Sequence, residues 1–177
     1  MGWVVLAVLE WRQRANEIAA NMLQSLYDPD RGRFHALHNG KPIAEVTPFN
    51  LYPLWTGRMS PEIEARLVEN LTDPQLFWSP YPLRTVARST ASYSPTTMWR
   101  GPVWININYI FIEALQRVGR TELAGQLRQQ TLDLVDRNLG IYEFYHPEQG
   151  VPPDKAAPMF GWSAALFIDL CLQHEAG

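Results

Sequence analysis

With 177 residues, 46% of them hydrophobic and 19% charged, the chain has the length and composition of one globular domain. Its net charge of −3 excludes the basic surface that nucleic acids or acidic lipids would bind. Cys171 is the single cysteine and the four histidines are scattered along the chain, so we expect no disulfide within the chain and no metal site. No organic cofactor is expected either.

The first predicted helix covers about residues 3–26. Apolar side chains recur along it at helical spacing, at Ala15, Ile18, Ala19, Met22, Leu23 and Leu26. The apolar stretch at its start is too short to span a membrane, and no basic segment precedes it. We therefore expect a cytoplasmic protein.

Four further helices follow in the sequence. Ser60 is a predicted N-cap with Pro61 at the first helical position, and Pro102 likewise predicts a helix start. That third helix has a predicted buried stripe and ends at Gly119; its stripe is Val103, Ile107, Ile110, Phe111, Ala114 and Val118. The fourth covers about residues 120–139 and the last about 162–173, while no run of alternating residues predicts a strand. The expected class is all-α, with antiparallel helical hairpins and long loops.

Three long loops, at about residues 28–59, 72–101 and 141–161, separate these helices. They contain most of the prolines and many aromatic residues, and loops of this length in a compact domain are usually functional. We expect them to build a surface at one end of the molecule. Two of them contain the similar segments YDPDRG and YHPEQG, a faint internal repeat.

The segment IYEFYHPEQG supplies a candidate catalytic carboxylate, Glu143. It lies between Tyr142 and Phe144, and a carboxyl group beside aromatic rings is partly desolvated, which suits it to proton transfer. The alternative is an exposed glutamate in a loop between core aromatic residues.

The segment MWRGPVWININY supplies candidate groups for a sugar. Arg100, ahead of the turn at Gly101, could bind hydroxyl groups or a carboxylate, and Trp99 or Trp104 could stack on a pyranose ring. Trp104 and Asn108 are four residues apart, so we expect them on a helix face that lines a cavity, opposite the apolar stripe. The alternative is a buried tryptophan and an asparagine that bonds to backbone groups.

The segment PMFGWSAAL gives a third aromatic cluster at a helix start. Gly161 permits close approach, and Trp162 could be another sugar platform. Packing of Phe160 and Trp162 in the core is the alternative.

Five segments in this order resemble the C-terminal half of the catalytic domain of glycoside hydrolase family 63 and its mannosylglycerate hydrolase-like relatives. They are TPFNLYPLWTG, LTDPQLFW, YSPTTMWRGPVWININY, YEFYHPEQG and FGWSAAL, and the resemblance covers about residues 26–172. It implies that the whole chain, residues 1–177, is a single partial domain forming about half of an (α/α)6 toroid. It also implies inversion at the anomeric carbon by a general acid and a general base.

The resemblance identifies Glu143 with the general base of the family. Trp99, Arg100, Trp104, Asn106 and Trp162 match its substrate-pocket segments, and Gly101, Asn108, Tyr142 and Phe160 complete the candidate binding residues. The expected ligand is an α-linked glucoside or mannoside, either an oligosaccharide or a compatible solute such as mannosylglycerate. No metal ion or cofactor is needed for this chemistry.

The general acid of the family, an aspartate, lies in the half of the barrel that this sequence does not match. We therefore expect a chain that is inactive alone, and whose exposed inner helix faces are covered by a second copy or by the missing half. The alternative is a non-catalytic helical module that binds sugars or proteins.

Overall fold

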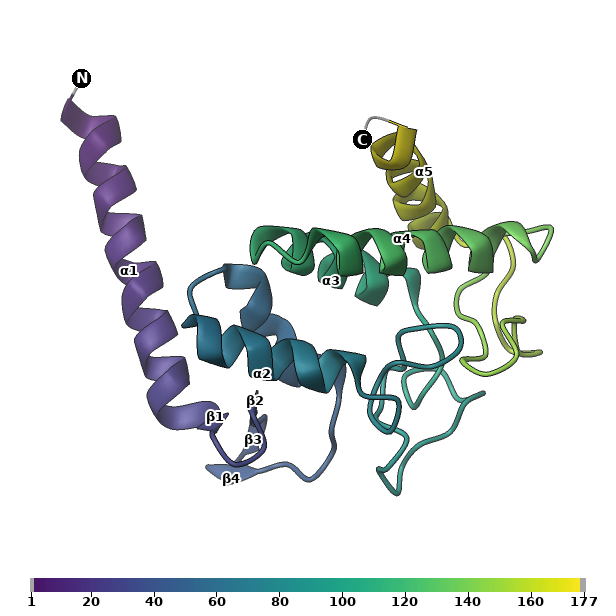
Figure 1. The fold of residues 1–177 in the computed structure, drawn as a ribbon, viewed down its shortest axis with the longest axis horizontal. Coiled ribbons are helices and arrows are strands. Elements are labelled where there is room, and N and C mark those ends of the chain that lie inside the picture. Colours follow the sequence, from purple (N-terminus) through teal and green to yellow (C-terminus); the bar gives the residue numbers. More distant parts are fainter. Residues whose placement is uncertain (1, 176–177) are drawn as a thin grey trace.

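The computed structural model describes residues 2–175, and the fold within them is helical (Figure 1). The helices are α1 (Gly2–Leu26), η1 (a 3₁₀ helix, Pro48–Thr56), α2 (Pro61–Thr72), α3 (Ile105–Arg117), α4 (Thr121–Asp136) and α5 (Gly161–Glu175). Two antiparallel strand pairs join them: β1 (Tyr27–Asp28) with β2 (Arg33–Phe34), and β3 (Leu37–His38) with β4 (Lys41–Pro42). The all-α class is confirmed. Strands of two residues are too short to show the alternation by which a sequence predicts strands.

The start of α2 follows its prediction, whereas the start of α3 does not. The Ser60 hydroxyl accepts a hydrogen bond from the Ile63 amide at 3.4 Å. In contrast, α3 begins at Ile105, three residues after Pro102. The reason is that Val103 is extended: its N–H donates to the carbonyl of Tyr145 at 2.8 Å, and the Tyr145 N–H donates back at 3.0 Å.

The core is centred on α3, which packs against α4, α5 and η1. Ile107, Phe111 and Ala114 of its predicted stripe are fully buried, while Ile110 and Val118 are half-buried. In Figure 1, α3 and α4 lie together, with α5 beside them and the long loops below. This arrangement puts the starts of α3 and α5 next to those loops.

The faint repeat of the sequence is a structural one. In the first copy the Gly32 N–H donates to the Asp28 carbonyl at 2.8 Å, and in the second the Gly150 N–H donates to the His146 carbonyl at 2.8 Å. The side chains at the second position also act alike. Asp28 Oδ1 and His146 Nδ1 each accept from the backbone N–H groups two and three residues ahead, at 3.0–3.3 Å. A polar acceptor at this position therefore organises both turns.

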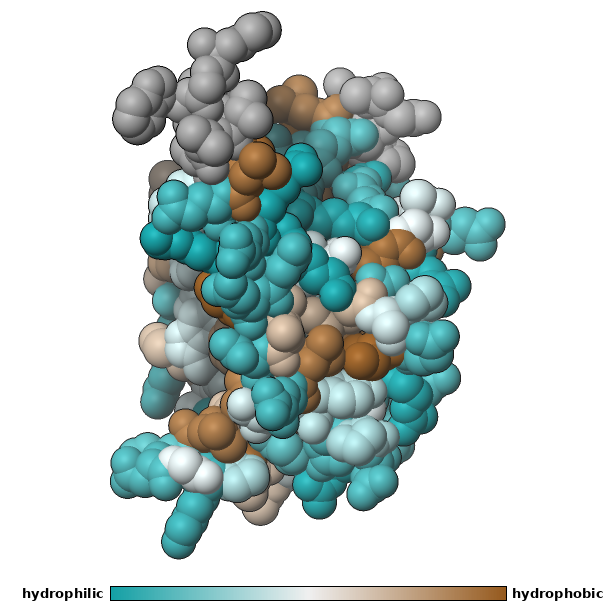
Figure 2. Space-filling view, turned by 90° about the vertical axis from the view of Figure 1, so that its left-hand side faces the viewer, coloured by the Kyte–Doolittle hydropathy of each residue, from teal (hydrophilic) through white to brown (hydrophobic). Residues whose placement is uncertain are grey.

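Helix α1 extends away from the rest of the fold (Figure 1). On the side of the molecule shown in Figure 2, the surface is mainly hydrophilic, with separate apolar patches. Exposed apolar side chains on α1 include Leu9, Trp11 and Ile18. Among the residues that the structure describes, none belongs to a helix both long and apolar enough to cross a membrane.

Candidate active site

Aromatic rings from three segments gather around Trp104, the residue that precedes α3. Trp99 stacks on it in parallel, with ring centroids 3.7 Å apart and an interplanar angle of 13°. Phe144 packs on it at 5.5 Å, and the rings of Phe160 and Trp162, at the start of α5, meet it edge-on at 6.2 and 6.5 Å. We call these five residues the Trp104 cluster. It joins the three predicted aromatic segments in one place.

Trp104 and Phe144 are the buried part of the cluster, whereas Trp99 and Trp162 face solvent. Trp104 is 3% exposed, whereas Trp99 is 37% and Trp162 is 50% exposed. The indole N–H of Trp104 donates to the Met98 carbonyl at 3.0 Å, which fixes the ring against residues 98–99. The accessible platforms for a ligand are thus Trp99 and Trp162, with Trp104 as their support.

Glu143 lies on the segment that carries Phe144 into this cluster. Its backbone N–H donates to the Ala157 carbonyl at 2.9 Å, and two residues later Tyr145 pairs with Val103, next to Trp104. The Glu143 side chain is half-buried and has no hydrogen bond or ion pair with any residue in the described part of the chain. Its carboxylate is therefore available to an external ligand.

The other predicted residues around the cluster differ in their surroundings. Arg100 is exposed and Asn106, on the first turn of α3, is half-exposed; neither side chain bonds to another described residue. Position 101 has room only for glycine, because a Cβ there would lie 2.8 Å from the Ser94 carbonyl oxygen. Tyr142 is half-buried with its ring 6.2 Å from that of Tyr145. Arg100 and Asn106 are therefore left without a side-chain partner among the described residues, and Gly101 shapes the turn.

The prediction that Asn108 lines a cavity is wrong. Asn108 is 0% exposed, and its amide accepts from the Leu83 N–H at 2.8 Å and donates to the Pro82 carbonyl at 2.7 Å and to the Thr131 hydroxyl at 2.9 Å. The face of α3 that carries it packs against residues 82–83 and α4. Asn108 therefore satisfies buried backbone groups, the alternative that the sequence left open.

Sequence reasoning missed a buried charged network that connects two of the long loops. Arg84 is 1% exposed, and its guanidinium donates through Nε and Nη2 to Glu148 Oε1 at 3.2 and 3.1 Å. The Tyr93 hydroxyl donates to the same oxygen at 2.7 Å. Burial, with the Glu148 bond adding to it, raises the pKa of Tyr93 to about 12. A single arginine in the apolar stretch PLRTVA was the available signal.

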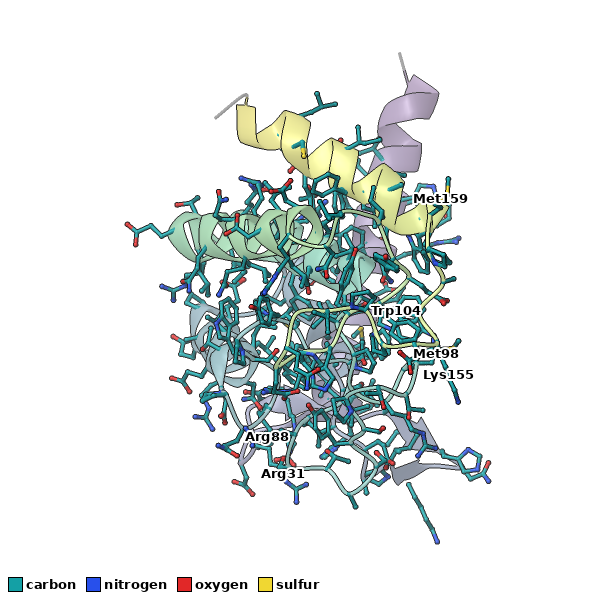
Figure 3. The ribbon with its side chains drawn as sticks, turned by 90° about the vertical axis from the view of Figure 1, so that its right-hand side faces the viewer. Arg31, Arg88, Met98, Trp104, Lys155 and Met159 are labelled. Carbon is teal, nitrogen blue, oxygen red and sulfur yellow. The ribbon has the colours of Figure 1, made fainter. Side chains whose placement is uncertain are left out.

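A cavity of about 620 Å³ adjoins the Trp104 cluster. Met98 and Phe144 contribute to its wall, together with residues 96–97, His146, Gln149 and residues 151–155. Figure 3 shows Trp104, Met98 and Lys155 along the same side of the molecule, while Arg31 and Arg88 lie away from them. Over the described residues, no group of three His, Cys, Asp or Glu side chains is placed to hold a metal ion.

Solved structures with a similar fold are glycosidases of the toroid type. The mannosylglycerate hydrolase of glycoside hydrolase family 63 from Thermus thermophilus, in complex with glucose, is 29% identical and superposes with a TM-score of 0.77 over 93% of this chain and 41% of that one. The neutral trehalase Nth1 from Saccharomyces cerevisiae, at 22% identity and a TM-score of 0.72, shares the fold. The chain is thus part of an (α/α)6 toroid.

The family follows from the sequence match. The model of the mannosylglycerate hydrolase MGH1-like glycoside hydrolase domain matches residues 6–163, and the chain belongs to this family. The mannosylglycerate hydrolase of Rubrobacter radiotolerans is 29% identical over 166 residues, and that of a second strain of Thermus thermophilus is 32% identical over 148 residues. The matches cover 90% and 82% of this chain but 37% and 35% of those relatives.

Proposed function

We propose that the chain is part of an inverting glycoside hydrolase for an α-linked glucoside or mannoside, with Glu143 as the general base. One observation carries the proposal: a half-buried carboxylate without a partner among the described residues lies on the segment that packs into the Trp104 cluster. Relatives named mannosylglycerate hydrolase, glucosylglycerate hydrolase and mannosyl-oligosaccharide glucosidase support this substrate class.

In the proposed reaction the Glu143 carboxylate removes a proton from a water molecule. The water oxygen bonds to the anomeric carbon as the bond to the leaving oxygen breaks, and the configuration inverts. A general acid on the opposite side of the sugar, about 6.5–9.5 Å away, protonates the leaving oxygen. Trp99 and Trp162 stack on the sugar, and Arg100 and Asn106 bind its hydroxyl groups.

The acid is not among the carboxylates we assign. Glu148 is occupied by Arg84 and Tyr93, and Asp169 accepts from Tyr109 and Gln173, both at 2.7 Å. Because we assign no general acid within the chain, we expect the acid to come from elsewhere when an ordinary glycoside is cleaved. We therefore expect the chain by itself to be inactive on such substrates.

Glycosyl fluorides test the proposal because fluoride leaves without protonation. We expect this chain to hydrolyse α-mannosyl or α-glucosyl fluoride slowly and to release the β-anomer, detected by proton NMR before mutarotation. Glu143→Gln removes the base and is expected to lower this rate about 100-fold or to the uncatalysed level.

The matched control is Glu122→Gln on the exposed first turn of α4, which is expected to leave the rate unchanged. Release of the α-anomer, or an unchanged rate for Glu143→Gln, contradicts the proposal. If the wild-type chain binds methyl α-mannoside saturably but releases no fluoride from the glycosyl fluorides, the non-catalytic sugar-binding module is favoured.

In this proposal a second copy of the chain, or the remainder of a toroid, completes the enzyme. The proposed location of the enzyme is the cytoplasm. Exposed apolar side chains on α1 and α5, among them Trp11, Ile168 and Leu172, support the need for such a cover.

A further inference from the structure

The cavity of about 620 Å³ is separate from the proposed catalytic carboxylate. Phe144 and His146 line it, but Glu143 does not. The ring of Phe144 packs on Trp104 as well as contributing to the cavity, so it forms a wall shared by the two sites. The cavity volume is within the range of small-molecule sites, about 300–1,000 Å³.

The cavity wall combines apolar surface with hydrogen-bonding groups. Its apolar part consists of Met98, Phe144, Val151, Pro152 and Pro153. Its polar residues include Thr96, Thr97, His146 and Gln149, of which Thr97 has its hydroxyl 2.8 Å from that of Ser94. A surface of this kind matches a sugar or polyol, whose C–H groups need apolar contact and whose hydroxyls need donors and acceptors.

His146 is held in one tautomer by the turn that contains it. Its Nδ1 accepts from the backbone N–H groups of Glu148 and Gln149 at 3.2 and 3.3 Å, and Glu148 Oε2 lies 3.4 Å from the same nitrogen. Because Nδ1 accepts the two backbone bonds, we assign the proton of the neutral ring to Nε2. No described residue accepts a hydrogen bond from Nε2, and the Gln149 side chain has no hydrogen bond to a described residue. Both side chains line the cavity and are free to bind a ligand there.

The charged residues that line this cavity do not favour a charged ligand. Asp154 and Lys155 are consecutive exposed residues of opposite charge, and both line it. The attraction of either residue for an ion of opposite charge is offset by repulsion from the other, so the pair favours neither an anion nor a cation over an uncharged molecule. We propose that this cavity is a second carbohydrate site, which binds one neutral sugar or polyol unit through His146 and Gln149. Because Glu143 takes no part in it, the site does not depend on the proposed catalytic function.

A titration of the ¹⁵N-labelled chain with D-glucose tests the proposal. The amide signals of Gln149, Val151 and Lys155 are expected to shift and saturate. Gln149→Ala removes a donor and an acceptor without changing the turn, and it is expected to weaken binding at these signals about fivefold. The matched control is Gln129→Ala on the exposed face of α4, which is expected to change nothing.

A second variant, His146→Asn, removes the Nε2 donor but retains an acceptor for the turn, as Asp28 does in the equivalent turn. It is also expected to weaken binding about fivefold while the chain remains folded. D-glucuronate and glucosamine are expected to bind no more tightly than glucose.

Three results of these titrations would contradict the proposal. The proposal is overturned if the signals of Gln149, Val151 and Lys155 show no saturable shift, if both variants bind glucose with wild-type affinity, or if a charged sugar binds more tightly than glucose. The indole N–H signals of Trp99 and Trp104 report sugar binding at the Trp104 cluster separately. Glu143→Gln leaves the cavity titration unchanged, so failure of the catalytic assignment is distinguishable from failure of this one.

Discussion

Asn106 and Asn108 are two residues apart on α3 and have different surroundings. Asn108 is enclosed and makes three hydrogen bonds, to Pro82, Leu83 and Thr131, whereas Asn106 is half-exposed without a side-chain bond to a described residue. Replacement of Asn108 is therefore expected to affect stability, whereas replacement of Asn106 is not.

Asn108→Ala is expected to lower the free energy of unfolding by about 3 kcal/mol, since it leaves three buried partners unsatisfied. Urea denaturation measures this. Asn106→Ala is the control on the same helix and is expected to change stability by less than about 0.5 kcal/mol. Equal losses in the two variants would show that the Asn108 bonds contribute little.

Because the pKa of the Tyr93 hydroxyl is raised in the folded chain, we expect a loss of stability at alkaline pH. Its pKa is raised from 10.0 to about 12 in the folded chain, by burial and then by the bond to Glu148. Since the unfolded chain releases this proton near pH 10, the stabilising contribution is complete below that pH and is lost between pH 10 and about 12. Urea denaturation at about pH 8 and about pH 11 measures the loss, which is expected to be smaller in Tyr93→Phe. An equal loss in the variant would assign the effect to other groups.

At the scale of elements, the two equivalent turns, Tyr27–Gly32 and Tyr145–Gly150, join segments that the sequence places far apart. The second turn contains Glu148, through which Arg84 and Tyr93 connect residues 72–101 to residues 141–161. Gly150 has φ +65°, and a Cβ there would lie 2.6 Å from the Tyr81 ring. The turn is thus fixed by both conformation and space.

Gly150→Ala is expected to cost about 3 kcal/mol, of which about 1 is for the left-handed backbone and the rest for displacement of Tyr81. Gly40→Ala is the matched control, because Gly40 has φ +73° and a Cβ added there would have no atom within 4 Å. It is expected to cost about 1 kcal/mol. Thermal or urea unfolding measures the loss of stability in each variant. Equal losses would mean that the Tyr81 ring moves aside without a cost in free energy.

At the scale of the whole molecule, α1 and α5 both expose apolar side chains. Ile168 and Leu172 are four residues apart on one face of α5, and both are more than half exposed. We expect the chain to self-associate through such surfaces when no other partner is present.

Size-exclusion chromatography with light scattering measures the association. The double variant Ile168→Glu, Leu172→Glu is expected to shift the chain toward the monomer, because it places charge on the apolar face of α5. Gln129→Glu on α4 adds charge elsewhere and is expected to have no effect. A monomeric wild-type chain would contradict the expectation.

By itself the sequence determined the five α-helices apart from the start of α3, the aromatic segments and the family, since helical spacing, capping residues and local motifs are short-range properties. It did not predict η1, which lies within the expected loop at residues 28–59. The positions of Glu143, Trp99, Trp104 and Trp162 in one region follow from that family resemblance. The structural repeat was also visible, although faintly, because its turn depends on residues close in the chain.

Tertiary structure alone decided which polar groups are buried and which are free. Asn108 is turned inward because residues 82–83 cover its face of α3, and the Arg84–Glu148–Tyr93 network joins residues up to 64 positions apart. Val103 is extended because Tyr145 pairs with it, which delays the start of α3. These outcomes depend on contacts distant in sequence, and helical periodicity carries no information about them.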